Sequence, residues 1–186
     1  MDRRRFLKDA AVLCAAAQVR AAAATAAQEE DVSARRIPRW RGFNLQGRFG
    51  EPGRPPAGRA FEELDFATMA EWGFDFARLP LSYWVWGSRD DWTLIREEPL
   101  TEIDRAVELG RQYGVHVNIN FHRLPGYCIN GREMEPADLF SGRAAERERA
   151  LAAAVHHWRA FARRYKGIPN RRLSFDLMNE PPKMRP

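Results

Sequence analysis

Short runs of strand-forming residues alternate with longer helical stretches from about residue 40 onward. Four runs predict β-strands, at residues 40–44, 74–79, 115–121 and 173–179. Apolar spacing predicts helices at 61–72 and 100–113, and a third helix on the stripe Leu151, Val155, Trp158, Ala162 and Tyr165. The resulting order, β-α-β-α-β-α-β, is typical of a parallel sheet with right-handed crossover connections.

Local signals predict where several of these elements begin and end. Gly73 and Gly114 follow the first two helices, and glycine takes the left-handed cap conformation without strain. Thr101, with Asp104 three residues later, predicts a capping box at the start of the second helix. Pro80 predicts the end of the second strand.

Two common architectures contain this alternation, the doubly wound open sheet and the (β/α)8 barrel. The first βα loop lacks a dinucleotide fingerprint, because bulky and charged residues separate Gly47, Gly50 and Gly53. A barrel takes about 250 residues, and about 160 of the 186 residues here follow the leader described next. The sequence therefore predicts an α/β fold, a (β/α)8 TIM barrel of which only about the first four strands are present.

The N-terminal residues have the pattern of an export signal. Paired arginines, then Phe6-Leu7-Lys8, precede an alanine-rich stretch that contains the cleavage pattern Ala24-Thr25-Ala26. An amphipathic first helix is the alternative, but the stretch shows no alternation of apolar and charged faces. We therefore expect a twin-arginine-type signal peptide at 1–27, a linker at 28–37 and the folded domain at 38–186. The export machinery is then one partner, and the protein is exported to the periplasm or the medium.

Charge and composition exclude several classes of protein. The net charge is +5, but residues 1–26 hold five basic and only two acidic side chains, so the expected domain carries little excess charge. A basic stripe typical of nucleic-acid binding is therefore not expected. No apolar run reaches the roughly 20 residues of a membrane span, so no stable membrane anchor is expected. Two cysteines, Cys14 and Cys128, cannot form a disulfide scaffold or a four-thiolate zinc site.

Polar residues follow or end each predicted strand. Asn44 ends the first, Arg78 the second, His122 the third, and Asn179 and Glu180 the fourth. Because active sites of barrels lie at the carboxyl ends of the strands, these side chains are expected to converge on one rim.

Several of these segments together resemble glycoside hydrolase family 5, the large cellulase family. They are Arg78-Leu79-Pro80, Phe121-His122-Arg123, the loop His122–Asn130, the opening R-G-F-N-L, and above all Leu177-Met178-Asn179-Glu180-Pro181. The resemblance extends from about Trp40 to Pro186. It implies an O-glycosyl hydrolase that cleaves β-linked polysaccharides or oligosaccharides with retention, most simply a cellulase-like endo-β-glucanase in polysaccharide catabolism.

The resemblance also assigns roles to residues. Glu180 matches the general acid/base, and its pKa would have to be raised for it to donate a proton to the leaving oxygen. Asn179 matches the asparagine that binds the sugar 2-hydroxyl, while Arg78, His122 and Asn44 are expected to bind substrate or orient carboxylates. No metal or organic cofactor is implied, because acid/base chemistry on an acetal needs neither.

One departure from the family concerns the second carboxylate. The family nucleophile is a glutamate at the end of the seventh strand, and the 186 residues contain no such strand. We therefore expect this chain alone to be inactive as a fragment. A truncated, non-catalytic pseudoenzyme or carbohydrate-binding half-barrel is the alternative function, and β-mannan or another β-glycan is the alternative substrate.

Aromatic residues crowd the loops that follow the second and third strands. Tyr83, Trp84 and Tyr127 are candidates to stack on sugar rings, whereas most such aromatics serve packing. Asp176, to which we assign no role, is expected inside the fourth strand, buried in the barrel with a basic partner, and His116 is expected to pack against a helix. His156 and His157 are expected to be exposed or packed, because adjacent helical residues face different directions.

Overall fold

The computed structural model describes residues 32–33, 35–49 and 60–182. Contacts divide the chain into two units, and the described part of the first is 32–33, 35–39 and 169–171. In this unit Ser33 and Arg36 exchange two backbone hydrogen bonds, of 3.2 and 2.9 Å. The predicted signal peptide lies outside the described residues, as do half of the predicted linker and residues 50–59. The second unit, from Trp40 onward, carries the sheet.

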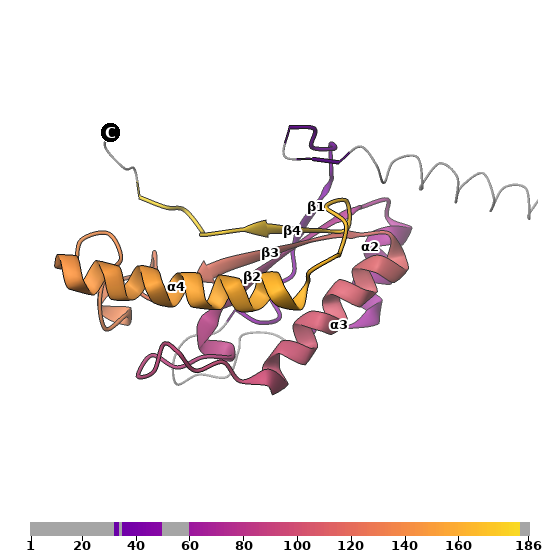
Figure 1. Ribbon diagram of the computed structural model, residues 1–186. Helices are drawn as coiled ribbons and strands as arrows, with labels where there is room; N and C mark the ends of the chain where they lie inside the picture. The colour runs from indigo at the N-terminus through magenta and orange to yellow at the C-terminus, as the bar shows by residue number, and fades with distance from the viewer. Residues whose placement is uncertain (1–31, 34, 50–59, 183–186) are drawn as a thin grey trace, which may run out of the picture. The chain divides into compact units, whose positions relative to one another are not determined.

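Four parallel strands form one sheet in the order β1-β2-β3-β4 (Figure 1). They are β1 (Gly42–Asn44), β2 (Phe76–Ser82), β3 (His116–Arg123) and β4 (Leu173–Asp176). Arg78 pairs with Asn118, and Asn118 pairs with Ser174, so the strands are in register across the sheet. The strand order never reverses, as it would in a doubly wound sheet. The predicted α/β architecture, the first four strands of a barrel, is confirmed.

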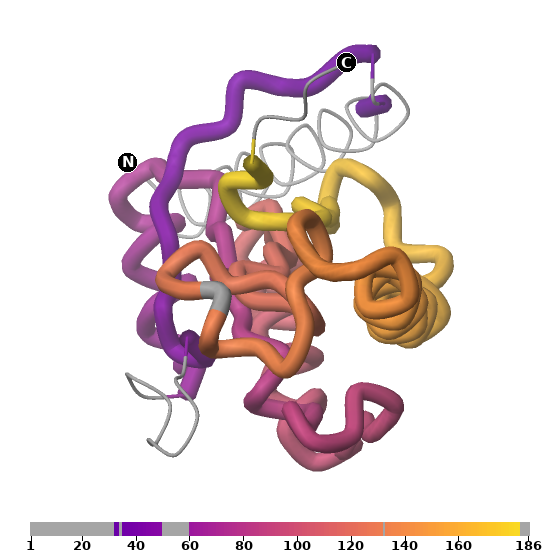
Figure 2. The backbone as a smooth tube through the Cα atoms, turned by 90° about the vertical axis from the view of Figure 1, so that its left-hand side faces the viewer, coloured from indigo at the N-terminus to yellow at the C-terminus, as the bar shows by residue number. Residues whose placement is uncertain are grey.

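Three helices connect the strands and lie on one side of the sheet (Figure 1). They are α2 (Glu63–Glu71), α3 (Glu97–Tyr113) and α4 (Ala144–Arg164), with short 3-10 helices at Tyr83–Val85 and Arg132–Met134. Figure 2 looks onto the carboxyl ends of the strands, where the connecting loops gather.

The core fills the space between the helices and the sheet. Alternate residues of β3, Val117, Ile119 and Phe121, point to this side and are fully buried. Close approach of α3 depends on Gly110, because a β-carbon there would lie 2.5 Å from a Val117 methyl group. Phe121 also stacks on Trp158 of α4, with ring centroids 3.7 Å apart. The other face of the sheet carries many polar residues, among them Arg78, Asn118 and Asp176.

Two predicted element ends are wrong. Pro80 lies inside β2 rather than at its end, opposite Asn120. Its missing N–H costs no ladder bond, because β1 pairs with β2 only as far as Arg78. The capping box is also absent, because α3 already begins at Glu97. Asp104 instead accepts hydrogen bonds from Arg164, the last residue of α4, and from Tyr165, which follows it.

The predicted apolar face of the third helix is wrong for most of its residues. Leu151 is 55% exposed and Val155 37% exposed, whereas the buried side of α4 holds mainly small residues and rings. The buried residues are Ala150, Ala153, Ala154, His157 and Phe161. Small side chains let the helix approach the sheet closely, so the larger aliphatic residues lie at its flank.

His116 is buried on the opposite side of the sheet from the one predicted. It lies on the polar face of β3, and its Nε2 is 2.7 Å from Ser174 Oγ. Its ring stacks on Trp40 at 3.7 Å and on Phe76 at 5.5 Å. The strand register explains the error, because even-numbered residues of β3 face away from the helices.

His157 is fully buried in the core, whereas its neighbour His156 is exposed. Trp86 Nε1 donates to His157 Nδ1 at 3.0 Å, and His157 Nε2 lies 2.8 Å from the carbonyl of Trp92. These partners fit a neutral ring with its proton on Nε2. Burial lowers the pKa of His157 from 6.5 to about 4.

Stability should therefore fall in acid because of His157. The unfolded chain binds the proton below pH 6.5 and the folded protein only near pH 4, so stability is lost as the pH falls through this window. Between pH 6.5 and 4.5 the loss from this residue should be about 2–3 kcal/mol. Urea unfolding at both pH values should show a smaller pH dependence in His157→Gln than in wild type. His156→Gln is the control, and an unchanged slope in His157→Gln would contradict the assignment.

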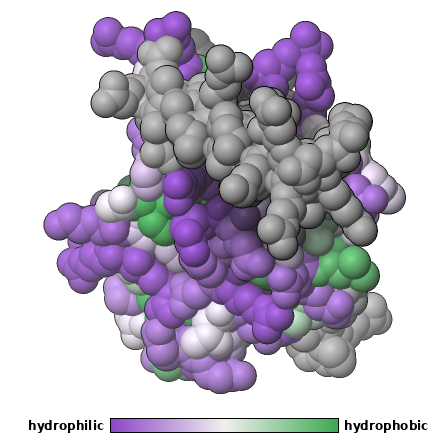
Figure 3. Space-filling model, turned by 90° about the vertical axis from the view of Figure 1, so that its right-hand side faces the viewer, coloured by the Kyte–Doolittle hydropathy of each residue, from purple (hydrophilic) through white to green (hydrophobic). Residues whose placement is uncertain are grey.

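The surface of the described residues is mixed and mainly polar on the face seen in Figure 3, with small separate apolar patches. Among the described residues, none of the helices combines the length and apolar character that crossing a membrane requires.

Candidate active site

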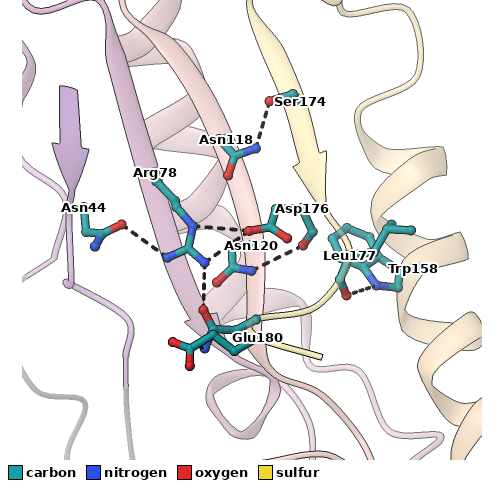
Figure 4. Close-up of polar contacts among 10 residues, drawn as sticks. Asn44, Arg78, Asn118, Asn120, Trp158, Ser174, Asp176, Leu177 and Glu180 are labelled. Atoms are coloured by element: carbon teal, nitrogen blue, oxygen red, sulfur yellow. Dashed lines mark hydrogen bonds and ion pairs between the residues drawn. The ribbon is translucent and has the colours of Figure 1, made fainter. Parts of the chain in front are cut away.

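Arg78 is the centre of a polar network on the open face of the sheet (Figure 4). Its Nη2 donates to Asn179 Oδ1 at 2.9 Å and lies 3.1 Å from Asp176 Oδ2. Its Nη1 donates to Asn44 Oδ1 at 3.3 Å. The guanidinium thus connects β1, β2 and the end of β4. A planar group with several fixed donors suits this position, because its three acceptors lie in different directions.

Asp176 has the basic partner that the sequence predicts, but it is the last residue of β4 and its side chain is 36% exposed rather than buried. Besides the ion pair, Arg78 Nε donates to the same carboxylate oxygen at 3.3 Å. Asn120, in the middle of β3, donates to the backbone carbonyl of Asp176 at 3.4 Å. The carboxylate is half-exposed, so the ion pair is weaker than a buried one. Its main effect is to fix the direction of the guanidinium.

The segment that carries Asn179 and Glu180 leaves the sheet before either residue, because β4 ends at Asp176. Three contacts hold it in place instead. Trp158 Nε1 donates to the carbonyl of Leu177 at 3.1 Å, and Asn179 N donates to the carbonyl of Phe121 at 3.3 Å. The hydroxyl of Tyr127 donates to the carbonyl of Glu180. The prediction that these two residues end a strand is corrected to an anchored turn.

Glu180 has a strained backbone and an exposed side chain. Its φ of 45° lies in the left-handed region, and it is the one non-glycine residue with positive φ in the described part of the chain. Such a conformation costs about 1–3 kcal/mol and persists only where the surroundings fix it. Asn179 is 5% exposed, and its amide nitrogen lies 3.5 Å from Glu180 Oε1. The carboxylate is therefore presented to solvent beside a buried amide.

His122 lies on the same face of the sheet, one residue before the end of β3. Burial and the charges of Arg78 and Arg123 lower its pKa to about 4, so it is neutral above that pH. Phe49 contacts the ring edge-on, with centroids 4.7 Å apart. Its Nδ1 is buried without a hydrogen-bond partner among the described residues. A neutral imidazole has one donor and one acceptor nitrogen, and the buried Nδ1 is not exposed to solvent.

The three aromatic candidates differ in exposure. Tyr83 is fully buried, its hydroxyl donates to Glu135 at 2.7 Å, and burial raises its pKa. A ring with no exposed surface does not stack on a sugar, so its assignment as a substrate contact is corrected to packing. Tyr127 is 8% exposed and acts on the Glu180 turn through its hydroxyl. Trp84 is partly exposed.

Two buried charged residues near these aromatics were not predicted. Glu135 accepts hydrogen bonds from Tyr83, from Trp84 Nε1 at 2.8 Å and from Gly126 N at 3.2 Å. Arg123 is 1% exposed and donates to Ser82 Oγ at 3.2 Å. Arg123 ends β3 and belongs to the segment Phe121-His122-Arg123, but that segment gives no sign that its guanidinium is buried. Glu135 belongs to no local motif, and two of its donors, Tyr83 and Trp84, are distant in sequence.

The site consists of a fixed guanidinium with its paired Asp176 carboxylate, two amides, a neutral imidazole and the exposed carboxyl group of Glu180. These groups can bind hydroxyls and exchange one proton with a bound molecule. Within the described ranges, histidine, cysteine and carboxylate side chains do not cluster in a way that could hold a metal ion.

Comparison with known proteins gives a family match over most of the chain. The family model for cellulase, glycosyl hydrolase family 5, matches residues 27–186. Cellodextrinase A of Ruminococcus flavefaciens is 33% identical over 119 residues, which cover 64% of this chain and 33% of that protein. Glucan 1,3-beta-glucosidase D of Emericella nidulans is 41% identical over 64 residues, 34% of this chain and 8% of that protein.

A solved structure supports the same fold. A crystal structure of a glycoside hydrolase is 35% identical, with a TM-score of 0.68 over 77% of this chain and 42% of that one. The chain thus spans less than half the length of these relatives. The four parallel strands and their three connecting helices match the corresponding part of that solved structure.

Proposed function

We propose that this chain, which belongs to glycosyl hydrolase family 5, supplies the general acid/base and part of the sugar-binding rim of a β-glucan hydrolase. The observation that carries the proposal is the hydrogen bond of 2.9 Å between Arg78 and the buried Asn179, next to the exposed carboxyl of Glu180.

The orientation of Asn179 follows from its bond to Arg78. A guanidinium only donates, so Asn179 must turn its carbonyl oxygen toward it. The NH2 group then donates to Glu180 Oε1 at 3.5 Å, and its second hydrogen remains to donate to a sugar hydroxyl. A hydrogen bond to the sugar 2-hydroxyl strengthens as the oxocarbenium-like transition state develops.

Glu180 is the proton donor in this proposal. Protonated, it donates to the glycosidic oxygen as the bond to the leaving sugar breaks, and the carboxylate then takes a proton from the attacking water. The Tyr127 hydroxyl and the Asn179 backbone fix the turn that aims this side chain. His122 is neutral above its lowered pKa of about 4, and it is a hydroxyl-binding group on the same rim.

Retention requires a second carboxylate about 5–5.5 Å from the first. Asp176 is the other carboxylate of the network, and the Arg78 guanidinium holds it within the sheet. We propose that the nucleophile is the glutamate of the family's seventh strand, outside the four strands described here. By this account the 186 residues alone bind glycan without hydrolysing it.

The proposed substrate is a β-linked glucan, because the names of two relatives specify cellodextrin and β-1,3-glucan. Both β-1,4 and β-1,3 linkages leave the equatorial 2-hydroxyl of each glucose free, which is the hydroxyl that Asn179 would bind in this proposal. The paired arginines and the Ala-x-Ala pattern of the first 27 residues support export through the twin-arginine route. N-terminal sequencing of the secreted protein should then begin close to residue 28.

The test is hydrolysis by the protein produced from its complete gene, including any codons beyond Pro186. Incubated with soluble β-1,4-glucan, laminarin and β-mannan, it should release reducing ends from a glucan. Proton NMR should show that the first product has the β configuration. No hydrolysis of any β-glucan, or an α product, would overturn the proposal. The 186-residue chain serves as the comparison.

A non-catalytic carbohydrate-binding protein is the second candidate. It is favoured by the pairing of Asp176 with Arg78, which leaves Glu180 as the exposed carboxyl of the described network. A stop codon directly after Pro186, together with glycan binding and no hydrolysis, would establish this function instead.

A further inference from the structure

Strand β3 ends in a β-bulge at His122. Consecutive residues of β2, Leu81–Ser82, pair with Phe121 and Arg123, which are two positions apart in β3. His122, which lies between them, is therefore an extra residue that is opposite no residue of β2. Bulges often occur beside active sites, where they change the direction of a side chain. The regular alternation of β3 is thus interrupted at its last two residues.

These two residues, His122 and Arg123, contact the same aromatic ring. Phe49, which follows β1, lies edge-on to His122 with ring centroids 4.7 Å apart. The Arg123 guanidinium lies over the Phe49 ring, 4.1 Å from its centroid. Neighbouring residues of a regular strand point to opposite faces of the sheet and do not share a contact of this kind. Because the bulge interrupts that alternation, one ring can link the guanidinium to the imidazole.

The Arg123 guanidinium is held by the segments that follow three strands. Its Nη1 donates to Ser82 Oγ, at the end of β2, at 3.2 Å, and its Nη2 donates to Asn130 Oδ1, in the loop after β3, at 2.8 Å. It also lies over the Trp84 ring, 5.1 Å from the centroid. The side chain is 1% exposed, and a desolvated cation is attracted to a ring more strongly than an exposed one. With Phe49, these contacts join the segments after β1, β2 and β3.

Charged groups on three strands and on the turn after β4 act on His122. Burial lowers its pKa to about 4, and the positive charges of Arg78 on β2 and Arg123 on β3 act in the same direction. The carboxylates of Glu180 and Asp176 act in the opposite direction. Because burial is the largest cause, the pKa of His122 reports how closely its surroundings, including the Phe49 ring, enclose the imidazole.

We propose that Arg123 is a positioning residue for the sugar-binding rim. Its guanidinium holds the Phe49 ring against His122 and joins three connecting segments at the bulge, so that the imidazole keeps one orientation. Arg123 itself is too deeply buried to touch a glycan. The inference rests on the proposed function, because it takes His122 to bind a hydroxyl group of the bound glucan.

The test combines titration of His122 with kinetics, in protein from the complete gene. The NMR signals of the histidine rings give the pKa values, and His122→Asn identifies the signal of His122. Arg123→Lys keeps the charge, but one ammonium nitrogen cannot bond to Ser82 and Asn130 and also stack flat on Phe49. The variant should raise the pKa of His122 from about 4 toward 6.5, because the imidazole gains solvent. It should lower kcat/KM on a soluble β-glucan about tenfold.

A second variant, Phe49→Leu, removes the linking ring and leaves Arg123 in place. It should also raise the pKa of His122. The double variant with Arg123→Lys should lose little more kcat/KM than the more impaired single variant, because both changes remove the same contact. Arg149→Lys is the matched control, since the exposed Arg149 of α4 also lies over an aromatic ring, that of Trp92, at 4.7 Å. It should leave the His122 pKa and kcat/KM unchanged.

The outcomes separate this inference from the proposed function. If Arg123→Lys and Phe49→Leu both keep the wild-type His122 pKa and kcat/KM, the positioning role is overturned and the proposed function stands. Fully additive losses in the double variant would also overturn it. If the wild type hydrolyses no glucan while the pKa rises in both variants, the proposed function is overturned and the link from Arg123 to His122 is confirmed. Thermal unfolding identifies any variant that fails to fold, and Phe49→Leu then decides in place of Arg123→Lys.

Discussion

Replacing Glu180 by glutamine should lower the hydrolysis rate of the complete enzyme on a natural β-glucan by about 10²–10⁴-fold, the usual contribution of a general acid/base. Glutamine keeps the size of the side chain and cannot donate a carboxylic proton. The Tyr127 bond is to the backbone carbonyl and persists in the variant, so the turn keeps its shape. Glycan affinity should change little.

The leaving group distinguishes an acid/base role from a structural one. A dinitrophenyl glucoside needs no protonation to leave, so bond cleavage with it should be far less impaired than with a glucan. The control is Glu71→Gln, an exposed glutamate at the end of α2. Equal impairment with both substrates would indicate misfolding or lost binding. Full activity would contradict the assignment of Glu180.

Replacing Arg78 by lysine should lower kcat/KM about 10²-fold although the charge is kept. One ammonium group cannot reach Asn44, Asp176 and Asn179 together, whereas the guanidinium bonds to all three at 2.9–3.3 Å. Asn179 then loses the bond that orients its amide. Displacement of a positioning group by about 1 Å is enough for a loss of this size.

Kinetics and unfolding temperature should be measured together for Arg78→Lys. The half-exposed ion pair contributes little to stability, so the unfolding temperature should change only slightly while activity falls. Arg105→Lys, an exposed residue on α3, is the control. Wild-type activity in Arg78→Lys would contradict this prediction. It would show that a positive charge at residue 78 is enough for activity and that the several N–H donors of arginine are not needed.

The order of the strands in the sheet could be predicted, and so could the meeting of the polar residues at one edge of it. Both follow from the order of strands and helices along the chain. Each strand alternates with a helix, and parallel strands place their carboxyl ends together. Asn44, Arg78 and Asn179 do meet in one network, as that reasoning predicts. Asp176 has the expected basic partner.

Errors arise where packing decides the structure. The alternation of β3 gives no indication of which face meets the helices, so His116 was placed on the wrong side. The buried side of α4 is selected by close contact of alanines with the sheet rather than by the largest apolar side chains. Pro80 is tolerated in β2 because β1 is short, and the local sequence does not reveal that length.

Glu135 could not be predicted either, because its contacts also depend on packing between distant parts of the chain. Glu135 receives hydrogen bonds from residues about 50 positions earlier in the chain. A single sequence carries no record of such a pairing. The burial of Tyr83 depends on the same contacts. Its place in the aromatic-rich loop after the second strand, taken alone, predicts a sugar-binding ring instead.

The most direct test is a crystal structure of the complete protein with Glu180→Gln and bound cellotetraose. A glycosidic oxygen should lie at hydrogen-bond distance, about 2.6–3.2 Å, from the residue 180 side chain. A sugar 2-hydroxyl should accept a hydrogen bond from the Asn179 amide. Cellotetraose bound away from Arg78, Asn179 and residue 180, or no bound sugar at all, would contradict the claim that this network is the catalytic rim.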